Sequence, residues 1–292
     1  MTNTKETATT MKSGYAAKRR TANIVIYVIL SVMVLIWVFP IVWLVMQSFN
    51  TLDRVSTNLF PEGFTLKHYQ TLFTDPNVPY GRWMLNTFLV ALFSCIISTL
   101  FVLMVSYALS RLRFKSRKKL LNMGLILGMF PGFMSMAATY SIMEIFHLDG
   151  QLIALVIVYS SGAGLGYQVA KGFFDTIPRA LDEAARIDGA TSNRIFWVII
   201  LPLSKPIIVY TALTTFLCPW ADYIFVSYFM KDNDQNFTIA LGLYQLLDNE
   251  HISTYFTTFC AGAVLIAIPI TILFIFMQRY YVSGVTGGAV KG

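Results

Sequence analysis

Long apolar runs alternate with short polar segments along most of the chain. The first run without a charged residue, residues 24–49, exceeds the roughly 20 residues that a helix needs to cross the hydrocarbon core of a membrane. Its length favours a retained membrane anchor over a signal peptide. Five more runs follow, at residues 85–110, 120–142, 152–170, 206–230 and 257–277. The pattern predicts an all-α integral membrane protein with six transmembrane helices.

Composition and charge agree with this class and add an orientation. Hydrophobic residues make up 56% of the chain and charged residues 13%, and the mean hydropathy is +0.61. With the N-terminus in the cytoplasm, 18 of the 22 Lys and Arg residues fall on the cytoplasmic side of the six-helix arrangement. This is the positive-inside distribution. It predicts that both termini are cytoplasmic, and it explains the net charge of +7 without a nucleic-acid partner.

The predicted topology divides the chain into three parts. Residues 1–23 form a cytoplasmic N-terminal tail, residues 24–278 a transmembrane domain, and residues 279–292 a cytoplasmic C-terminal tail. Within the domain, residues 171–205 form a long cytoplasmic loop, while residues 50–84 and 231–256 form outer loops.

The cytoplasmic loop 171–205 has the sequence features of two short helices. Pro178 suits a first helical turn, and Asp182 and Glu183 complement the positive end of that helix. Gly189 is placed to end the helix. Residues 191–193, Thr-Ser-Asn, offer N-caps for a second helix. The loop is therefore predicted to fold as helix, glycine bend, helix.

The first of these helices carries a narrow apolar stripe. Leu181, Ala184 and Ala185 lie at i, i+3 and i+4. The charges beside the stripe are Glu183, Arg186 and Asp188. Because small side chains allow close approach and the flanking charges have mixed sign, the pattern favours docking to a protein. The alternative is an amphipathic helix that lies on lipid headgroups.

The same residues carry a family resemblance. The spacing EAA, three residues, G, nine residues, I-x-LP is matched without a gap by Glu183, Ala184, Ala185, Gly189, Ile199, Leu201 and Pro202. The chain thereby resembles permease subunits of ABC importers. FFDTIPRALDEAA, IDGA, MLNTFLVAL and the terminal SGVTGGAVKG resemble the carbohydrate-uptake branch, and especially its smaller maltose/maltodextrin-type permease.

The resemblance implies a role and a set of partners. Glu183, Ala184, Ala185 and Gly189, with Arg186 and Asp188 beside them, would dock as a coupling helix into a cytoplasmic ATPase dimer. The glycine-rich tail, with Gly287, Gly288 and Lys291, would reach the ATPase interface; alternatively it is a frayed terminus. A second, homologous permease, an extracytoplasmic solute-binding protein and a sugar substrate are the other implied partners, in the lipid of a prokaryotic cytoplasmic membrane.

The sequence contains no motif for chemistry of its own. No GxxxxGK[ST] occurs, so ATP and Mg are expected on the partner ATPase, with no cofactor on this chain. HExxH and GxSxG are absent as well. Cys95, Cys218 and Cys260 lack metal or disulfide spacing and are interpreted as packing residues. The chain is therefore predicted to be a transport subunit and not an enzyme.

The fourth and fifth apolar runs contain candidates for a substrate pathway. Gly162 and Gly166 form a GxxxG pair, with Gly164 between them, which favours either close helix packing or a weakened helix beside a water-filled cavity. In the fifth run, Asp222 is either a functional carboxylate in the membrane or a residue at the outer interface. The aromatic candidates for sugar contact are Tyr159, Tyr167, Trp220 and Tyr223. The resemblance weighs against such contacts, since it places the membrane sugar site mainly on the larger partner subunit.

The outer loop 231–256 is predicted to contain a short amphipathic helix and an exposed polar tip. The tip consists of Asp248, Asn249, Glu250 and His251. By resemblance it contacts the solute-binding protein; alternatively it is a solvated loop without a role.

Taken together, these features predict an importer of sugar or oligosaccharide, maltodextrin-like, that is driven by a partner ATPase. Two alternatives stay open: an ion-coupled secondary sugar transporter, and a membrane scaffold that transports nothing.

Overall fold

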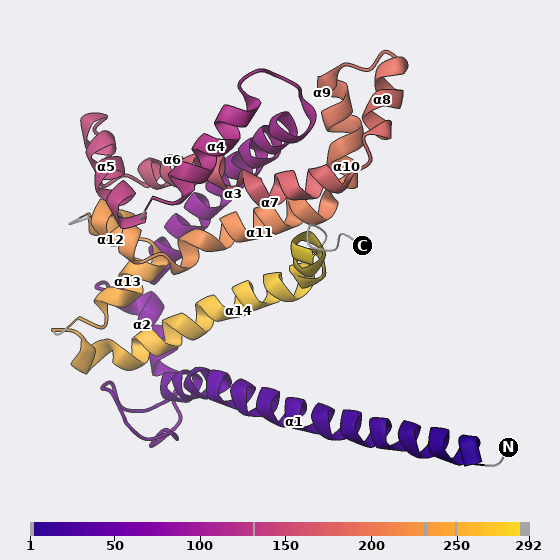
Figure 1. Cartoon of the computed structure of the whole chain (residues 1–292). Coiled ribbons are helices and arrows are strands. Elements are labelled where there is room, and N and C mark those ends of the chain that lie inside the picture. Colours follow the sequence, from indigo (N-terminus) through magenta and orange to yellow (C-terminus); the bar gives the residue numbers. More distant parts are fainter. Residues whose placement is uncertain (1–2, 131, 231–232, 249, 287–292) are drawn as a thin grey trace.

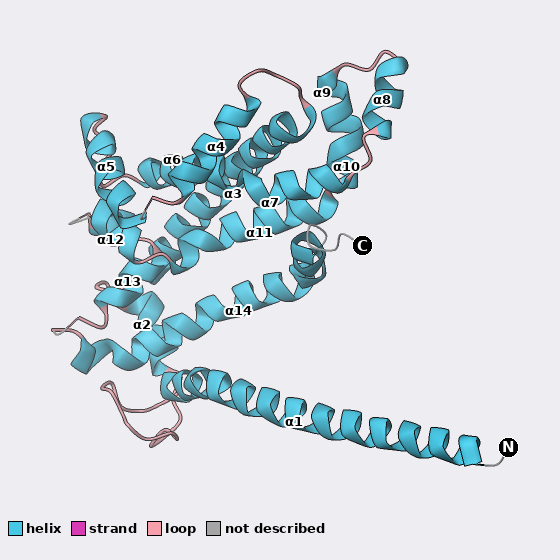
Figure 2. Cartoon of the chain, viewed as in Figure 1, coloured by secondary structure: helices cyan, strands magenta, loops and turns pink. Residues whose placement is uncertain are grey.

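The fold is described from a computed structural model that covers residues 3–130, 132–230, 233–248 and 250–286. Helices account for the architecture of these residues (Figure 2), and the only extended pairing among them is a single bridge between Asn50 and Phe64. The all-α prediction is confirmed for this part of the chain.

The helices, in chain order, are α1 (Asn3–Ser48), α2 (Lys67–Thr74), α3 (Tyr80–Arg111), α4 (Arg117–Gly128), α5 (Gly132–Ile145), α6 (Leu152–Ser161), α7 (Ala163–Thr176), α8 (Ala180–Ile187), α9 (Ser192–Ile195), a π-turn η1 (Phe196–Ile200), α10 (Leu201–Leu203), α11 (Lys205–Ala221), α12 (Ile224–Met230), a 3₁₀ turn η2 (Asp234–Asn236), α13 (Ile239–Gln245) and α14 (Ile252–Thr286).

Helix α3 lies at the centre of the bundle and packs against α6, α7 and α11 (Figure 1). Its buried face contains small or hydroxyl residues, among them Ser94, Ser98 and Ser106. Small side chains let membrane helices approach closely, and hydroxyls bond across the contact. The Ser106 hydroxyl donates to the backbone carbonyl of Tyr167 at 3.0 Å and so joins α3 to α7.

Among the described residues, three helices are long and apolar enough to cross a membrane, within α1, α3 and α14. Two bent pairs pass the same test together: α6 with α7, at 43°, and residues 192–203 with α11, at 83°. The predicted third span, 120–142, is not one helix, because α4 ends at Gly128 and α5 begins at Gly132. The sequence between them contains Pro131, which removes a helical hydrogen bond. The predicted fifth span, 206–230, is likewise divided, between α11 and α12. Six transmembrane passages therefore stay a prediction.

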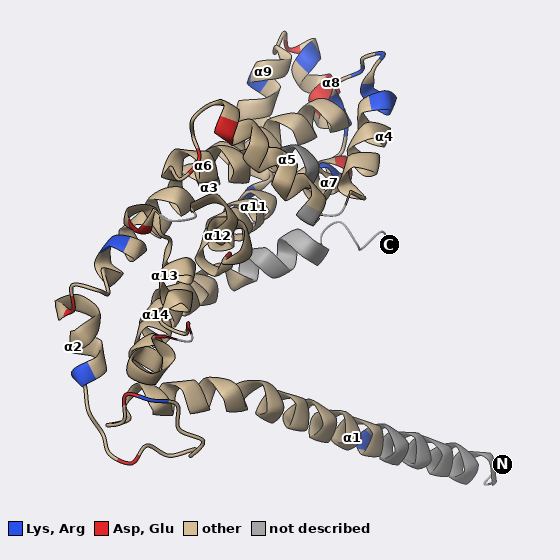
Figure 3. Cartoon of the chain, turned by 90° about the vertical axis from the view of Figure 1, so that its left-hand side faces the viewer, with Lys and Arg blue, Asp and Glu red and all other residues tan. Residues whose placement is uncertain are grey.

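Helix α1 projects from the rest of the molecule (Figures 1 and 3). It begins at Asn3, so it continues through much of the segment predicted as an N-terminal tail. Residues 20–42 are exposed within this single chain. At the other end of the helix, Gln47 donates to the carbonyl of Asn58 at 2.7 Å and accepts from the Asn50 amide at 3.0 Å. Ser48 bonds the Tyr69 hydroxyl of α2 at 2.8 Å, and Trp43 packs on Phe256 of α14, so the helix is attached to the bundle through its last turns.

The buried apolar residues form two clusters at opposite ends of α3. The larger lies at the end of the molecule that contains α2 and α13, hereafter the α13 end, and includes Trp83, Phe229 and Leu243. The smaller lies beside α8 and α9, hereafter the α8 end, and includes Phe174 and Ile195. Each end of the central helix therefore has its own core.

Polar contacts hold the α13 end together. The side-chain amide of Asn86 donates to the carbonyls of Gln235 and Phe237, each at 3.0 Å. His68 is buried, and its Nε2 lies 2.8 Å from the carbonyl oxygen of Asn50. Burial lowers the pKa of His68 below its usual value, so the ring is neutral at pH 7 and suits this site.

Gly242 on α13 packs directly against the Trp83 ring, and a Cβ at this position would overlap the ring. Gly242→Ala is expected to lower the unfolding free energy by about 1–3 kcal/mol, because an added carbon in a packed core forces its neighbours apart. Thermal unfolding of the purified chain in detergent measures this. Gly81→Ala is the matched control, since a Cβ there meets nothing within 4 Å; an equal loss in both variants would contradict the packing.

Candidate functional site

The loop 171–205 folds as the sequence predicts, into α8, a glycine bend and α9. Gly189 has φ +81°, a conformation that favours glycine. Its N–H donates to the Arg186 carbonyl at 3.0 Å, and the Ala190 N–H donates to the Ala185 carbonyl at 2.9 Å. These are the two hydrogen bonds of a Schellman motif. The bend is therefore fixed by backbone bonds that need glycine at this position.

Beyond the bend, the chain turns back toward the bundle. The Thr191 hydroxyl accepts from the Arg194 N–H at 3.3 Å and caps α9. The π-turn η1 and α10 then lead to Ser204, where the direction changes by 83° into α11. Consequently α8 and α9 stand beyond the end of the bundle (Figure 1).

Arg111, the last residue of α3, attaches α8 to the bundle. Its guanidinium lies 3.3 Å from Asp182 Oδ2 in the first turn of α8. It also donates to the carbonyls of Phe174 and Ile177, at 2.5 and 2.8 Å. The two charged side chains are only 2% and 10% exposed. One side chain thus joins the end of α3, the end of α7 and the start of α8.

The exposed face of α8 differs from the predicted stripe by one residue. Leu181 and Ala184 are exposed, as predicted, but Ala185 is buried in the cluster at the α8 end. Ile187 is 87% exposed and lies beside them on the helix. The exposed apolar face of α8 is therefore Leu181, Ala184 and Ile187. A helical period of 3.6 residues places Ala185 on one side of Leu181 and Ala184, and Ile187 on the other. Packing against α3 and α7 decides which of these two sides faces outward.

Charged residues surround this face (Figure 3). Glu183, Arg186 and Asp188 are all exposed. Together with the apolar face, they form what is hereafter the α8 face. Gly287, Gly288 and Lys291 of the C-terminal tail lie outside the described residues.

The glycine segment of the fourth apolar run forms the junction between α6 and α7. Gly162 separates the two helices, whose axes differ by 43°. A Cβ on Gly166 would meet Val102 of α3 at 3.8 Å, so this position packs closely against α3. The helix is therefore interrupted at Gly162, whereas Gly166 packs against the neighbouring helix α3. Gly164 lies in the first turn of α7.

Asp222 occupies the break between α11 and α12. It accepts from the Tyr159 hydroxyl at 2.9 Å and from the Phe225 N–H at 3.0 Å. Tyr159 and Gly162 also line a cavity of about 230 Å³ whose other walls come from α3, α7 and α11. The hydroxyl residues in that lining are Ser98, Tyr210, Thr211, Thr214 and Thr215. The sequence did not single out these five, although hydroxyls in apolar helices are a signal that can find them.

The remaining aromatic candidates do not join this cavity. Tyr167 lies on the α4 side of α7, and Trp220 is buried in the cluster at the α13 end. Tyr223 packs on Tyr244 with ring centroids 3.9 Å apart. The seven predicted pathway residues therefore do not form one site.

The polar tip follows α13. Asp248, Glu250 and His251 are exposed, and Asn249 lies outside the described residues. His251 borders a cavity of about 410 Å³ that Gln245 and Tyr255 also line.

The Arg111–Asp182 pair is expected to show strong coupling. Arg111→Met or Asp182→Leu alone leaves a buried charge without its partner, which costs about 3–5 kcal/mol. The double variant is expected to lose less than the sum of the two, because it removes both charges. Thermal unfolding of the four proteins measures the coupling.

Lys67→Met is the matched control, because the Lys67–Asp53 pair is 62% and 45% exposed and such pairs contribute at most about 1 kcal/mol. If the double variant loses as much unfolding free energy as the two single variants together, Arg111 and Asp182 do not stabilise each other and the proposed ion pair is ruled out.

Comparison with known proteins places the whole chain in one group. The family model described as "Binding-protein-dependent transport system inner membrane component" matches residues 13–287. The galactooligosaccharides transport system permease protein GanQ of Bacillus subtilis is 38% identical over 91% of this chain and 94% of its own length. The maltodextrin transport system permease protein MalD of Streptococcus pneumoniae is 33% identical over 97% of this chain and 100% of its own.

A solved structure shares the fold. One chain of a bacterial ABC transporter involved in alginate import aligns with a TM-score of 0.78 and 21% identity, over 90% of this chain and 97% of that one. The relatives are transport permeases and not enzymes. The matched span and the identities show that this chain belongs to the binding-protein-dependent transport system inner membrane component family, as a membrane permease subunit.

Proposed function

We propose that the chain is a permease subunit of an ABC importer that moves a sugar or oligosaccharide across a prokaryotic cytoplasmic membrane. A cytoplasmic ATPase dimer, which carries ATP and Mg, supplies the energy. A second, homologous permease completes the pathway, and an extracytoplasmic solute-binding protein delivers the substrate. The observation that supports this most directly is the α8 face: an exposed apolar patch with charges around it, on a helix that a buried ion pair joins to α3 and α7.

The geometry suggests how force passes from the ATPase to the membrane. A partner that grips the α8 face moves Asp182, which is held by Arg111. Arg111 ends α3 and binds the last carbonyls of α7, so both helices move with α8. The bends at Gly162 and Ser204 are places where α7 and α11 can change angle. Alternating access of the pathway would follow from these rotations.

The substrate class rests on the relatives. Of the two relatives described above, MalD is named for maltodextrin and GanQ for galactooligosaccharides. We therefore propose a maltodextrin-like oligosaccharide, and a galactooligosaccharide as the second candidate. The hydroxyl-lined cavity beside Tyr159 and Gly162 lies between α3, α6, α7 and α11, where a subunit of this kind would border the pathway. Asp222 would hold its wall by bonding Tyr159. The exposed residues of the 248–251 tip would face the solute-binding protein, and the C-terminal tail would face the ATPases.

Ile187→Asp is expected to release the ATPase. A large apolar side chain that becomes buried in a docking interface can contribute about 2 kcal/mol or more to binding, so co-purification from membranes should fall roughly 30-fold. Ile187→Leu, which keeps the apolar surface, is expected to retain the ATPase. Full retention by Ile187→Asp would place the contact elsewhere.

Uptake separates the proposed function from a scaffold and from a secondary transporter. Cells that lack the chain are expected to lose uptake of radiolabelled maltodextrin or galactooligosaccharide, and the wild-type chain should restore it. Restoration is expected to fail when the partner ATPase carries an inactivating substitution in its nucleotide site. Uptake that persists with the inactive ATPase would indicate secondary transport, and unchanged uptake without the chain would indicate a scaffold.

A further inference from the structure

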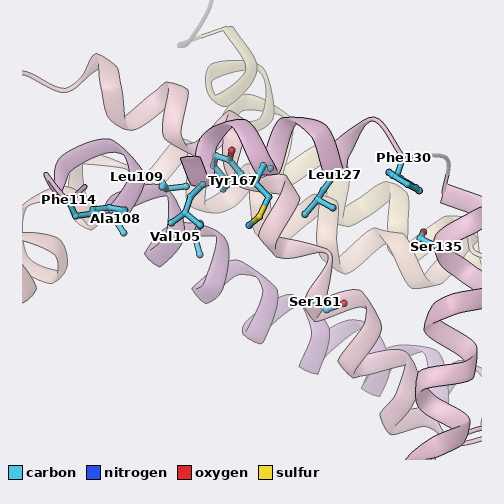
Figure 4. Close-up of a pocket in the computed structure, with 12 residues that line it drawn as sticks. Val105, Ala108, Leu109, Phe114, Leu127, Phe130, Ser135, Ser161 and Tyr167 are labelled. Carbon is cyan, nitrogen blue, oxygen red and sulfur yellow. The ribbon is translucent and has the colours of Figure 1, made fainter. Parts of the chain in front are cut away.

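An open apolar groove of about 740 Å³ runs between α3, α4 and α7 (Figure 4). Phe114 and Ala108 lie at one end, and Phe130 and Ser135 lie at the other. Tyr167 forms part of its floor, where its hydroxyl lies 3.4 Å from the Leu121 carbonyl. A Cβ on Gly124 would press on the Tyr167 ring, so α4 sits close to α7 at this point. The groove is therefore a shaped feature of three packed helices.

The groove is short enough to lie within one leaflet of a bilayer. The α4 residues that line it run from Leu120 to Leu127, which is about 11 Å at 1.5 Å per residue, and Phe114 and Phe130 extend the lining beyond that stretch. Half of the roughly 30 Å hydrocarbon core is about 15 Å. The lining is mostly apolar, with exposed Met123 and Leu127. An acyl chain can thus lie along the groove within a single leaflet.

The end of the groove at Phe114 carries a dense group of positive charges. Between Phe114 and Leu120, which both line the groove, the sequence reads KSRKK, and Arg113 precedes them. The four residues Arg113, Lys115, Lys118 and Lys119 are exposed, and none of them takes part in an ion pair among the described residues. Figure 3 shows these charges on the start of α4 and the segment before it. We name the four residues the basic mouth.

An apolar groove with positive charges at one end fits a ligand that has an acyl chain and a negatively charged headgroup. We propose that this groove is a binding site for an anionic phospholipid, with an acyl chain between α3, α4 and α7 and the headgroup phosphate on the basic mouth. Basic pockets between membrane helices on the cytoplasmic side hold acidic headgroups in this way. The positive-inside orientation puts the basic mouth in the cytoplasmic leaflet.

The lipid would support the α8 end of the bundle. Arg117, within the same segment, uses its Nε to donate to the Leu109 carbonyl at 2.7 Å, two residues before Arg111. A headgroup phosphate that binds the neighbouring lysines would hold the start of α4 against the end of α3, next to Arg111. The site is independent of the transported substrate, so it can fail while the proposed function stands.

Native mass spectrometry of the full-length chain tests the site. The chain is mixed in mild detergent with equal amounts of phosphatidylglycerol and phosphatidylcholine that have identical acyl chains, and the expected result is retention of phosphatidylglycerol in preference. Each basic residue near an anionic lipid contributes about fivefold to binding, so Lys115→Gln/Lys118→Gln/Lys119→Gln is expected to reduce the preference at least tenfold. Ala108→Trp, which fills the groove, is expected to reduce retention of both lipids.

The matched control removes three positive charges at the α13 end, as Arg54→Gln/Lys67→Gln/Arg82→Gln. It is expected to keep the preference. Equal preference in the lysine variant and the wild type would overturn the proposal, and so would an equal loss in the control. A photoreactive amino acid at Met123, activated in native membranes, gives the second test: a lipid adduct supports the site, and an adduct only to a protein would show that a partner subunit covers the groove.

Discussion

The arrangement of the α8 end depends on one buried cation. Arg111 ends the central helix with its charge almost fully removed from water, and its two terminal nitrogens bond a carboxylate on α8 and two carbonyls at the end of α7. An unpaired charge at this depth would cost several kcal/mol. The three elements are therefore held in one relative position, and a displacement of α8 that kept the pair intact would carry α3 and α7 with it.

The membrane part of the chain combines continuous helices with interrupted ones. Helix α3 is unbroken over 32 residues, whereas the helices around it break at Gly162, Ser204 and Asp222. Backbone groups released at such breaks need partners, because the hydrocarbon core offers no water. At Asp222 the carboxylate supplies one, by accepting from the Phe225 N–H. This division suits a subunit in which a central helix receives force and its neighbours change angle.

Polar groups inside the bundle have two different roles. Ser106 and Asn86 bond backbone carbonyls across helix contacts and fix the packing. The hydroxyls beside Tyr159 line a cavity instead. The groove at α4 contrasts with both, since its polar component lies at the mouth and its interior is apolar. A substrate pathway and a lipid site would accordingly occupy opposite sides of α7, and neither would interfere with the other.

The sequence by itself determined the helical class, the apolar runs, the glycine bend and the family motif, because each depends on local spacing or on backbone conformation. Gly189 illustrates this, since its positive φ follows from its own lack of a side chain. Tertiary structure alone decided that Ala185 faces inward and Ile187 outward, since a period of 3.6 residues fixes a stripe but not its exact edge. It also decided that Arg111 meets Asp182 across 71 positions, and that Tyr159 and Tyr167 lie apart. These pairings arise from the way whole helices pack, and no local pattern encodes the distance between residues on different helices.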